Sequence, residues 1–156
     1  MFKINRKLEY ALIALRHMSS KPPGPLTSAK EICDVYHTPF DPTSRVLQIM
    51  AQHEIVRAEQ GAHGGYQILK DLSKITLFDL TQIIEGPLQI VNCFHGHYPH
   101  CAMTTNCNVI SPMLNLNERL SEFFKTINVR ELISSRNQGE RQIRSKPFMQ
   151  ADESKD

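Results

Sequence analysis

Apolar side chains recur every three or four positions from residue 4 to residue 18, the pattern of a helix with one buried face. Residues 19–25 contain three prolines and a glycine, which end this helix. Its predicted buried positions are Leu8, Ala11, Leu12, Leu15 and Met18.

A second, shorter helix follows the proline-rich stretch. Its expected N-cap is Thr27 or Ser28, and Glu31 lies three residues after Ser28, which is the spacing of a capping box. Cys33 is interpreted as a small core residue of this helix. The whole predicted apolar face consists of Ala29, Ile32, Cys33 and Tyr36.

A turn at residues 37–42 leads to a third helix, which Asp41 or Thr43 is expected to cap and which ends near His53. Two short helices joined by a tight turn are typical of a helix-turn-helix, although any packed pair of helices shows the same pattern. The residues predicted to face inward are Val46, Leu47, Ile49 and Met50.

Two short strands are predicted next, at residues 55–59 and 66–69, with glycine-rich turn chemistry between them. A hairpin directly after a helix-turn-helix is the winged-helix arrangement. The turn glycines allow the wing backbone to approach a phosphate or a groove closely.

Two further helices are predicted in the C-terminal half. Thr76 is expected to cap one from Leu77 to Glu85, which Gly86 and Pro87 end. A longer helix begins near residues 111–112, and its apolar stripe has no obvious cover within a small winged helix. We therefore expect a second subunit to cover it, rather than its own domain. The stripe consists of Met113, Leu116, Leu120, Phe123, Phe124 and Ile127.

These patterns predict a mainly α fold: a winged helix-turn-helix with a small β-hairpin wing and a long C-terminal dimerisation helix. Residues 1–90 form the expected DNA-binding domain and 91–108 a cysteine segment. Residues 109–134 form the dimerisation helix, and 135–156 are polar without period, as in a disordered tail.

Composition narrows the class of protein only slightly. The chain has 156 residues, 40% of them hydrophobic, enough for one domain. A net charge of +2 does not by itself indicate nucleic-acid binding. No apolar stretch approaches the roughly 20 residues of a membrane span, and no signal peptide is visible, so a cytoplasmic protein is expected. No catalytic motif is recognisable, so an enzyme is not expected.

Three cysteines lie close together late in the chain: Cys93, Cys101 and Cys107, with seven and then five residues between them. Three thiolates on one flexible segment are able to converge on a single metal centre, and soft sulfur ligands select an iron–sulfur cluster, zinc or copper(I). Three hypotheses remain open: an iron–sulfur cluster, a structural zinc site with three cysteines and one histidine, and a metal-free thiol switch. Candidate fourth ligands within the segment are His95, His97 and His100.

Candidate DNA contacts lie near the start of the second helix of the helix-turn-helix. Arg45 suits bidentate contact with guanine and Gln48 with adenine. Thr43 and Ser44 suit phosphate or base contacts. A basic N-terminal cluster suits phosphate and consists of Lys3, Arg6 and Lys7.

The succession of features resembles a known family. A winged helix, residues 75–80 leading to Glu85-Gly86, a three-cysteine segment and a long helix are together similar to the IscR/NsrR group of bacterial regulators, the Rrf two family. The segment 61–66 is similar to that family's glycine-rich wing, which ends in Gly-Gly-Tyr. The resemblance covers about residues 1–134. Residues 27–36 and 88–93 are most similar to the nitric-oxide-sensing NsrR branch.

The resemblance implies a homodimer that binds a palindromic operator in double-stranded DNA. It further implies that a [2Fe–2S] or [4Fe–4S] cluster controls repression or activation. Some relatives place a cluster-ligating carboxylate of the partner subunit at the position of Glu9. Relatives more often have five residues between the first two cysteines, and often have arginine at the position of Gln60. In this chain His63 or Arg57 is then expected to supply the wing contact.

Overall fold

The computed structural model describes residues 5–90 and 106–134. The predictions on Lys3, on Cys93 and Cys101, on the histidines of the cysteine segment and on the tail fall outside these residues. The elements in chain order are α1 (Arg6–Ser20), α2 (Ala29–Tyr36), α3 (Phe40–Gln52), β1 (Val56–Glu59), β2 (Gly65–Ile68), the 3₁₀ helix η1 (Leu72–Lys74), α4 (Leu77–Glu85), α5 (Ile110–Thr126) and α6 (Val129–Ser134).

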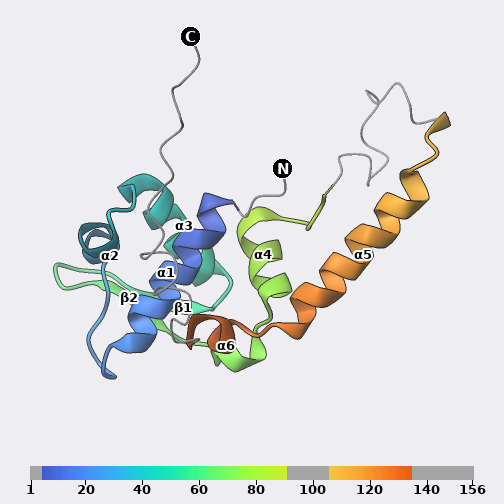
Figure 1. The fold of residues 1–156 in the computed structure, drawn as a ribbon. Helices are drawn as coiled ribbons and strands as arrows, with labels where there is room; N and C mark the ends of the chain where they lie inside the picture. The colour runs from blue at the N-terminus through green and yellow to red at the C-terminus, as the bar shows by residue number, and fades with distance from the viewer. Residues whose placement is uncertain (1–4, 91–105, 135–156) are drawn as a thin grey trace, which may run out of the picture.

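The fold is mainly helical with one antiparallel hairpin, as predicted (Figure 1). Helix α1 lies between the α2–α3 pair and α4, and it also contacts α6 and β2. Its apolar face forms the centre of the core because its side chains recur at helical spacing. All but the partly buried Leu12 of the predicted α1 positions are buried: Leu8, Ala11, Leu15 and Met18.

The N-cap of α2 is Ser28, whose Oγ accepts the Glu31 backbone N–H at 3.1 Å. The predicted capping box is only half formed, because the Glu31 carboxylate bonds Lys21 and His17 instead. Tyr36 was predicted to face the core, but it is 42% exposed and its hydroxyl meets His17.

Helix α3 begins earlier than predicted, at Phe40, with Pro39 as an N-cap that makes no side-chain hydrogen bond. Neither Asp41 nor Thr43 caps it. The Thr43 hydroxyl is fully buried and donates to the Thr38 Oγ1 at 2.9 Å, so it holds the turn between α2 and α3. The predicted inward residues Val46, Leu47 and Met50 are buried, and Ile49 is partly buried.

Strands β1 and β2 pair from Val56 opposite Ile68 to Glu59 opposite Gly65. Thr27 forms an isolated antiparallel bridge with Tyr66 of β2: its backbone N–H donates to the Tyr66 carbonyl at 3.0 Å, and its carbonyl accepts the Tyr66 N–H at 2.8 Å. A Cβ on Gly65 would lie 2.8 Å from the Thr27 carbonyl oxygen, so only glycine permits this approach. The hairpin is therefore seated directly on the chain that enters α2.

Thr76 caps α4, as predicted, and the structure adds a complete capping box with Asp79. The prediction of one helix over 109–134 is wrong, because α5 ends at Thr126 and α6 begins at Val129. The break is a backbone pairing with distant residues. The Leu77 N–H donates to the Ile127 carbonyl at 2.8 Å, and the Val129 N–H donates to the Ile75 carbonyl at 2.9 Å.

Helix α5 extends away from the rest of the molecule (Figure 1). Phe124, near its C-terminal end, is buried, whereas Leu116 and Phe123 are 50% and 58% exposed. Among the described residues, no helix has the length and apolar character that a membrane crossing needs.

Candidate nucleic-acid interface and metal-binding segment

Arg45 and Gln48 lie on the exposed surface of α3, where residues three apart share a face. Neither side chain has a hydrogen bond or ion pair with the described part of the chain. A guanidinium and an amide without internal partners are available for bidentate contacts with base edges. Ser44, half-buried, borders the same face. Thr43 lies on the opposite, buried side and is not part of this surface.

Two further exposed residues lie in the first turn of α3 and were not predicted to take part in binding: Asp41 shares the face of Arg45, which it precedes by four residues, and Phe40 lies to one side of that face. Phe40 is 54% exposed in the first turn of α3, and Asp41 follows it, also exposed. An aromatic ring suits the methyl group of thymine, and a carboxylate suits the amino group of cytosine. Sequence reasoning missed both because it started the helix too late, and so placed them in the turn.

The wing tip carries the predicted residues Gln60 and His63, both exposed. Arg57, one of the two expected substitutes for a wing arginine, has partners within the hairpin: its Nη2 donates to Glu59 Oε1 at 2.8 Å and to Gln67 Oε1 at 3.4 Å. His63 has no hydrogen bond or ion pair within the described residues. It is therefore the better placed of the two to contact DNA.

The basic cluster at the N-terminus is only partly free. Arg6 is exposed and pairs with Glu9 at 3.5 Å, an exposed contact of small energy. Lys7 is exposed and lies near Glu85. Burial raises the pKa of Glu85, a shift that the Leu8 backbone N–H, the Lys7 charge and the Asn5 side chain only partly offset.

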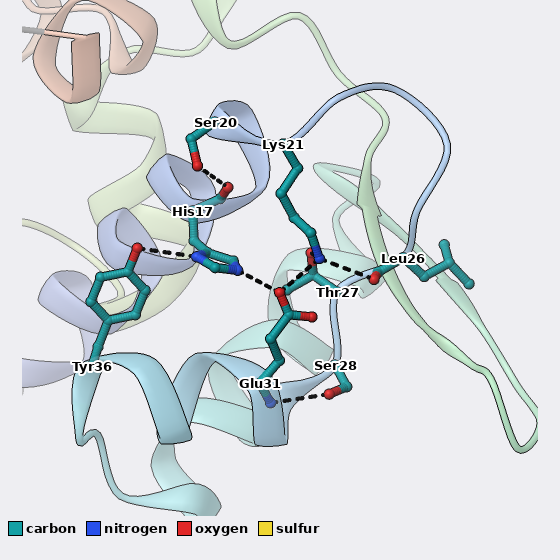
Figure 2. A network of polar contacts seen from close by, with 8 residues as sticks. All are labelled: His17, Ser20, Lys21, Leu26, Thr27, Ser28, Glu31 and Tyr36. Atoms are coloured by element: carbon teal, nitrogen blue, oxygen red, sulfur yellow. Dashed lines mark hydrogen bonds and ion pairs between the residues drawn. The ribbon is translucent and has the colours of Figure 1, made fainter.

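A network of polar contacts joins the end of α1 to α2 and to the wing (Figure 2). We call it the Lys21 cluster, and it consists of His17, Lys21, Thr27, Glu31 and Tyr36. The Glu31 carboxylate accepts from Lys21 Nζ and His17 Nε2, both at 2.7 Å. Burial raises the pKa of Glu31, but the hydrogen bonds and charges of Lys21 and His17 outweigh it, so the pKa is lowered overall. The His17 Nδ1 lies 3.1 Å from the Tyr36 hydroxyl.

The cysteine segment is attached to α5 at both ends. Before it, the buried Asn117 of α5 accepts the Ile90 N–H at 3.0 Å and donates to the Leu88 carbonyl at 3.2 Å. After it, Cys107 is a free, half-buried thiol three residues before α5 begins. The described residues on both sides of the segment are thus connected to α5.

A cleft of about 620 Å³ is lined in part by the residues that lead into this segment, Leu88 to Ile90. Its walls come from the start of α1, the end of α4 and α5, and include Leu8, Glu85, Ile90, Met113 and Phe124. Glu9 lies on α1 with its side chain 41% exposed. Within residues 5–90 and 106–134 no group of three or more metal-ligating side chains converges. Of the proposed metal ligands, Cys107 and Glu9 are the two that belong to the described residues.

The chemistry of the predicted donor set fits a soft metal centre, since Cys107 is a free thiol at the end of a segment that carries two more cysteines. The other described cysteine, Cys33, lies on α2, where its Sγ accepts from the Thr38 hydroxyl at 3.6 Å.

Comparison with solved structures shows the same fold in several bacterial regulators. CymR (YrzC), the global cysteine regulator of B. subtilis, has a TM-score of 0.66 and 20% identity, over 88% of this chain and 100% of that chain. Staphylococcus aureus CymR has a TM-score of 0.63 and 15% identity, over 85% of this chain and 99% of that chain. T. potens IscR has a TM-score of 0.61 and 16% identity, over 90% of this chain and 96% of that chain.

The family model Rrf2, described as an iron-dependent transcriptional regulator, matches residues 4–135. This match includes the winged helix, the cysteine segment, α5 and all of α6. It agrees with the resemblance seen in the wing and around Glu85-Gly86. The chain therefore belongs to the Rrf2 family of transcriptional regulators.

Proposed function

We propose that this protein is a repressor whose affinity for a palindromic DNA operator is switched by an iron–sulfur cluster, [2Fe–2S] or [4Fe–4S]. The observation that carries the proposal is the attachment of the three-cysteine segment to α5 through Asn117 and Cys107. A change at the cysteines then acts directly on the helix proposed to join the two subunits.

The proposed protein ligands are Cys93, Cys101 and Cys107, with Glu9 of the partner subunit as the fourth. Releasing Glu9 from Arg6 costs at most about 1 kcal/mol, because that pair is exposed. The cluster supplies iron that reacts with nitric oxide and oxidants, and a carboxylate ligand leaves one iron more accessible than a fourth thiolate would.

The proposed dimer forms through α5. The helix extends from the body, and its apolar residues Leu116 and Phe123 are half or more exposed in the single chain (Figure 1). Large apolar side chains in this position indicate a protein contact. A second copy of α5 supplies a matching apolar face, and two-fold symmetry places two α3 helices on the two halves of an operator.

DNA is proposed to be contacted by three parts of the chain. Arg45 and Gln48 read base edges, and Ser44 supports them. Gln60 and His63 reach the minor groove from the wing. The phosphate contacts come from Lys3, Arg6 and Lys7.

Nitric oxide is the proposed signal, in line with the resemblance to the NsrR branch. When the cluster is lost, the cysteines beside the N-terminal end of α5 are no longer held together, and the packing of α5 between the subunits changes. The spacing of the two α3 helices changes with it. The required coupling is modest, since about 1–3 kcal/mol gives roughly 5- to 150-fold in DNA affinity.

The ligand assignment is tested by replacing single cysteines in anaerobically purified protein. Cys101→Ala and Cys107→Ala should lose the visible chromophore and acid-labile sulfide yet remain folded helical dimers. Cys33→Ala is the matched control, because Cys33 lies on α2 beside Thr38, and it should keep both. A full cluster in Cys101→Ala or Cys107→Ala would refute the ligand set.

Colourless wild-type protein with stoichiometric zinc would favour a structural zinc site instead. Metal-free protein whose DNA affinity follows thiol oxidation would favour a thiol switch.

A further inference from the structure

The Lys21 ammonium group uses all three of its N–H donors within the protein. Its Nζ donates to the Leu26 carbonyl at 3.3 Å, to Thr27 Oγ1 at 3.1 Å and to Glu31 Oε1 at 2.7 Å (Figure 2). The side chain is only 22% exposed. A lysine in this state is a structural connector, whereas a surface lysine leaves its donors to water or to phosphate.

The first element that Lys21 holds is the wing. Thr27, whose hydroxyl bonds Lys21, is 1% exposed, and its backbone makes both hydrogen bonds of a bridge to Tyr66 in β2. The adjacent Gly65 packs against the Thr27 carbonyl with no room for a side chain. A shift of Thr27 therefore shifts β2, and the hairpin that carries Gln60 and His63 moves with it.

The second element is the helix-turn-helix. Glu31 lies in the first turn of α2, and its carboxylate is fixed between Lys21 and His17 at the end of α1. Close packing joins α2 to α3, which carries Arg45 and Gln48. One ammonium group thus connects the base of the wing to the helix pair that is proposed to enter the major groove.

We propose that Lys21 is a positioning residue for DNA recognition: it fixes the wing relative to α2 and α3, so that the wing and α3 contact one DNA site together. The inference rests on the proposed DNA-binding function. Lys21 itself does not touch DNA, because its three donors are used internally. Without the ammonium group, the Leu26 carbonyl and the Thr27 hydroxyl lose this donor and Glu31 keeps only His17.

The test is a double-mutant cycle on DNA binding by the full-length dimer purified anaerobically. The probe is a duplex selected by wild-type protein from random-sequence DNA. One change is Lys21→Met, which keeps the stem and removes the charge. The other is the paired wing-tip change Gln60→Ala with His63→Ala. The matched control for lost charge is Lys74→Met, because Lys74 is exposed in η1 and its side chain has no hydrogen bond or ion pair within the described residues.

We expect Lys21→Met to weaken binding roughly 5- to 20-fold, within the range of a coupling between sites. The wing-tip change should weaken wild-type binding by a similar factor, but should change binding less than about twofold in the Lys21→Met background. Lys21→Arg should recover most of the affinity, and Lys74→Met should retain it. Circular dichroism must show unchanged helix content, and Glu31→Gln, which loosens the same contact, should give the same non-additivity.

The inference is overturned if the wing-tip change weakens binding equally in both backgrounds, or has no effect in wild type. It is also overturned if Lys74→Met matches Lys21→Met, since charge alone then accounts for the loss. If wild-type protein selects no duplex at all, the DNA-binding function itself fails, which is a distinct result.

Discussion

Replacement of Asn117 by leucine should disconnect the cysteine segment from α5. The Asn117 amide is 5% exposed and makes two hydrogen bonds to backbone groups just before the segment, to Ile90 N–H at 3.0 Å and to the Leu88 carbonyl at 3.2 Å. Leucine has nearly the same size and shape but neither donates nor accepts. The change therefore removes the tether and leaves most of the packing in place.

Each of the two hydrogen bonds contributes about 1 kcal/mol net, and an orphaned backbone group in a partly buried place costs about 1–3 kcal/mol. We expect Asn117→Leu to lower the free energy of unfolding by about 2–3 kcal/mol. With a denaturant slope of about 2 kcal/mol/M, this moves the urea midpoint down by roughly 1–1.5 M. Protein concentration must be the same for all variants, because a dimer's stability depends on it.

The measurement is urea unfolding followed by far-ultraviolet circular dichroism. Asn115→Leu is the control: it makes the same substitution two residues away on α5, where the side chain is exposed, and should change stability by less than about 0.5 kcal/mol. If Asn117→Leu is no more destabilising than Asn115→Leu, the tether contributes nothing and the argument that α5 holds the cysteine segment is refuted.

Four more predictions address other parts of the chain. Arg45→Ala should weaken binding to the selected operator by about 1–3 kcal/mol and relax the preference at one base pair, measured by gel shift on single-base operator variants; equal loss on all sequences would make it a phosphate contact. Phe123→Glu should shift the protein to monomer in analytical ultracentrifugation with its helix content retained, and an unchanged dimer would place the interface elsewhere. Thr76→Ala should cost about 1 kcal/mol in thermal unfolding, because it removes the hydrogen bond that the Thr76 Oγ1 accepts from the Asp79 N–H, while the Asp79 carboxylate still accepts the backbone N–H of residue 76. The pKa of Glu31 is lower in the folded than in the unfolded protein, where it is about 4.3, so ionised Glu31 stabilises the fold at pH values above that. This contribution to stability is lost as the pH falls through the pKa of the folded state. Glu31→Gln should therefore flatten the acid side of the stability profile, and an identical profile in the variant would show that Glu31 plays no part.

Short-range sequence patterns were sufficient to predict the elements that are determined by residues near one another in the chain. The caps at Ser28 and Thr76, the hairpin at residues 56–68 and the buried stripe of α1 all follow from short-range hydrogen bonds and periodicity. The resemblance was carried by the winged helix, residues 75–86, the cysteine segment and the long helix, and the match over residues 4–135 confirms the Rrf2 family.

Local rules failed where distant residues compete. The break between α5 and α6 arises because residues 127–129 pair with the backbone at 75–77, about 50 residues earlier in the sequence. Glu31 leaves its capping box for Lys21 and His17, which belong to another helix. Thr43 was read as a cap and a DNA contact because threonine suits both, but its hydroxyl is buried against Thr38.

The site residues on α3 were partly predictable, since exposed Arg45 and Gln48 have the expected chemistry. The contribution of Asn117 was not, because an asparagine among apolar positions gives no local signal of its partners.

The central claim is that the cysteine segment holds an iron–sulfur cluster that controls DNA affinity. Its most direct test is to purify the protein without oxygen, measure iron, acid-labile sulfide and the visible spectrum, and compare operator affinity before and after titration with nitric oxide. We expect brown protein with iron and sulfide, bleached by nitric oxide, and operator affinity that falls at least fivefold as the colour is lost. Protein that stays colourless and free of iron after anaerobic reconstitution, or operator affinity unchanged by bleaching, would contradict it.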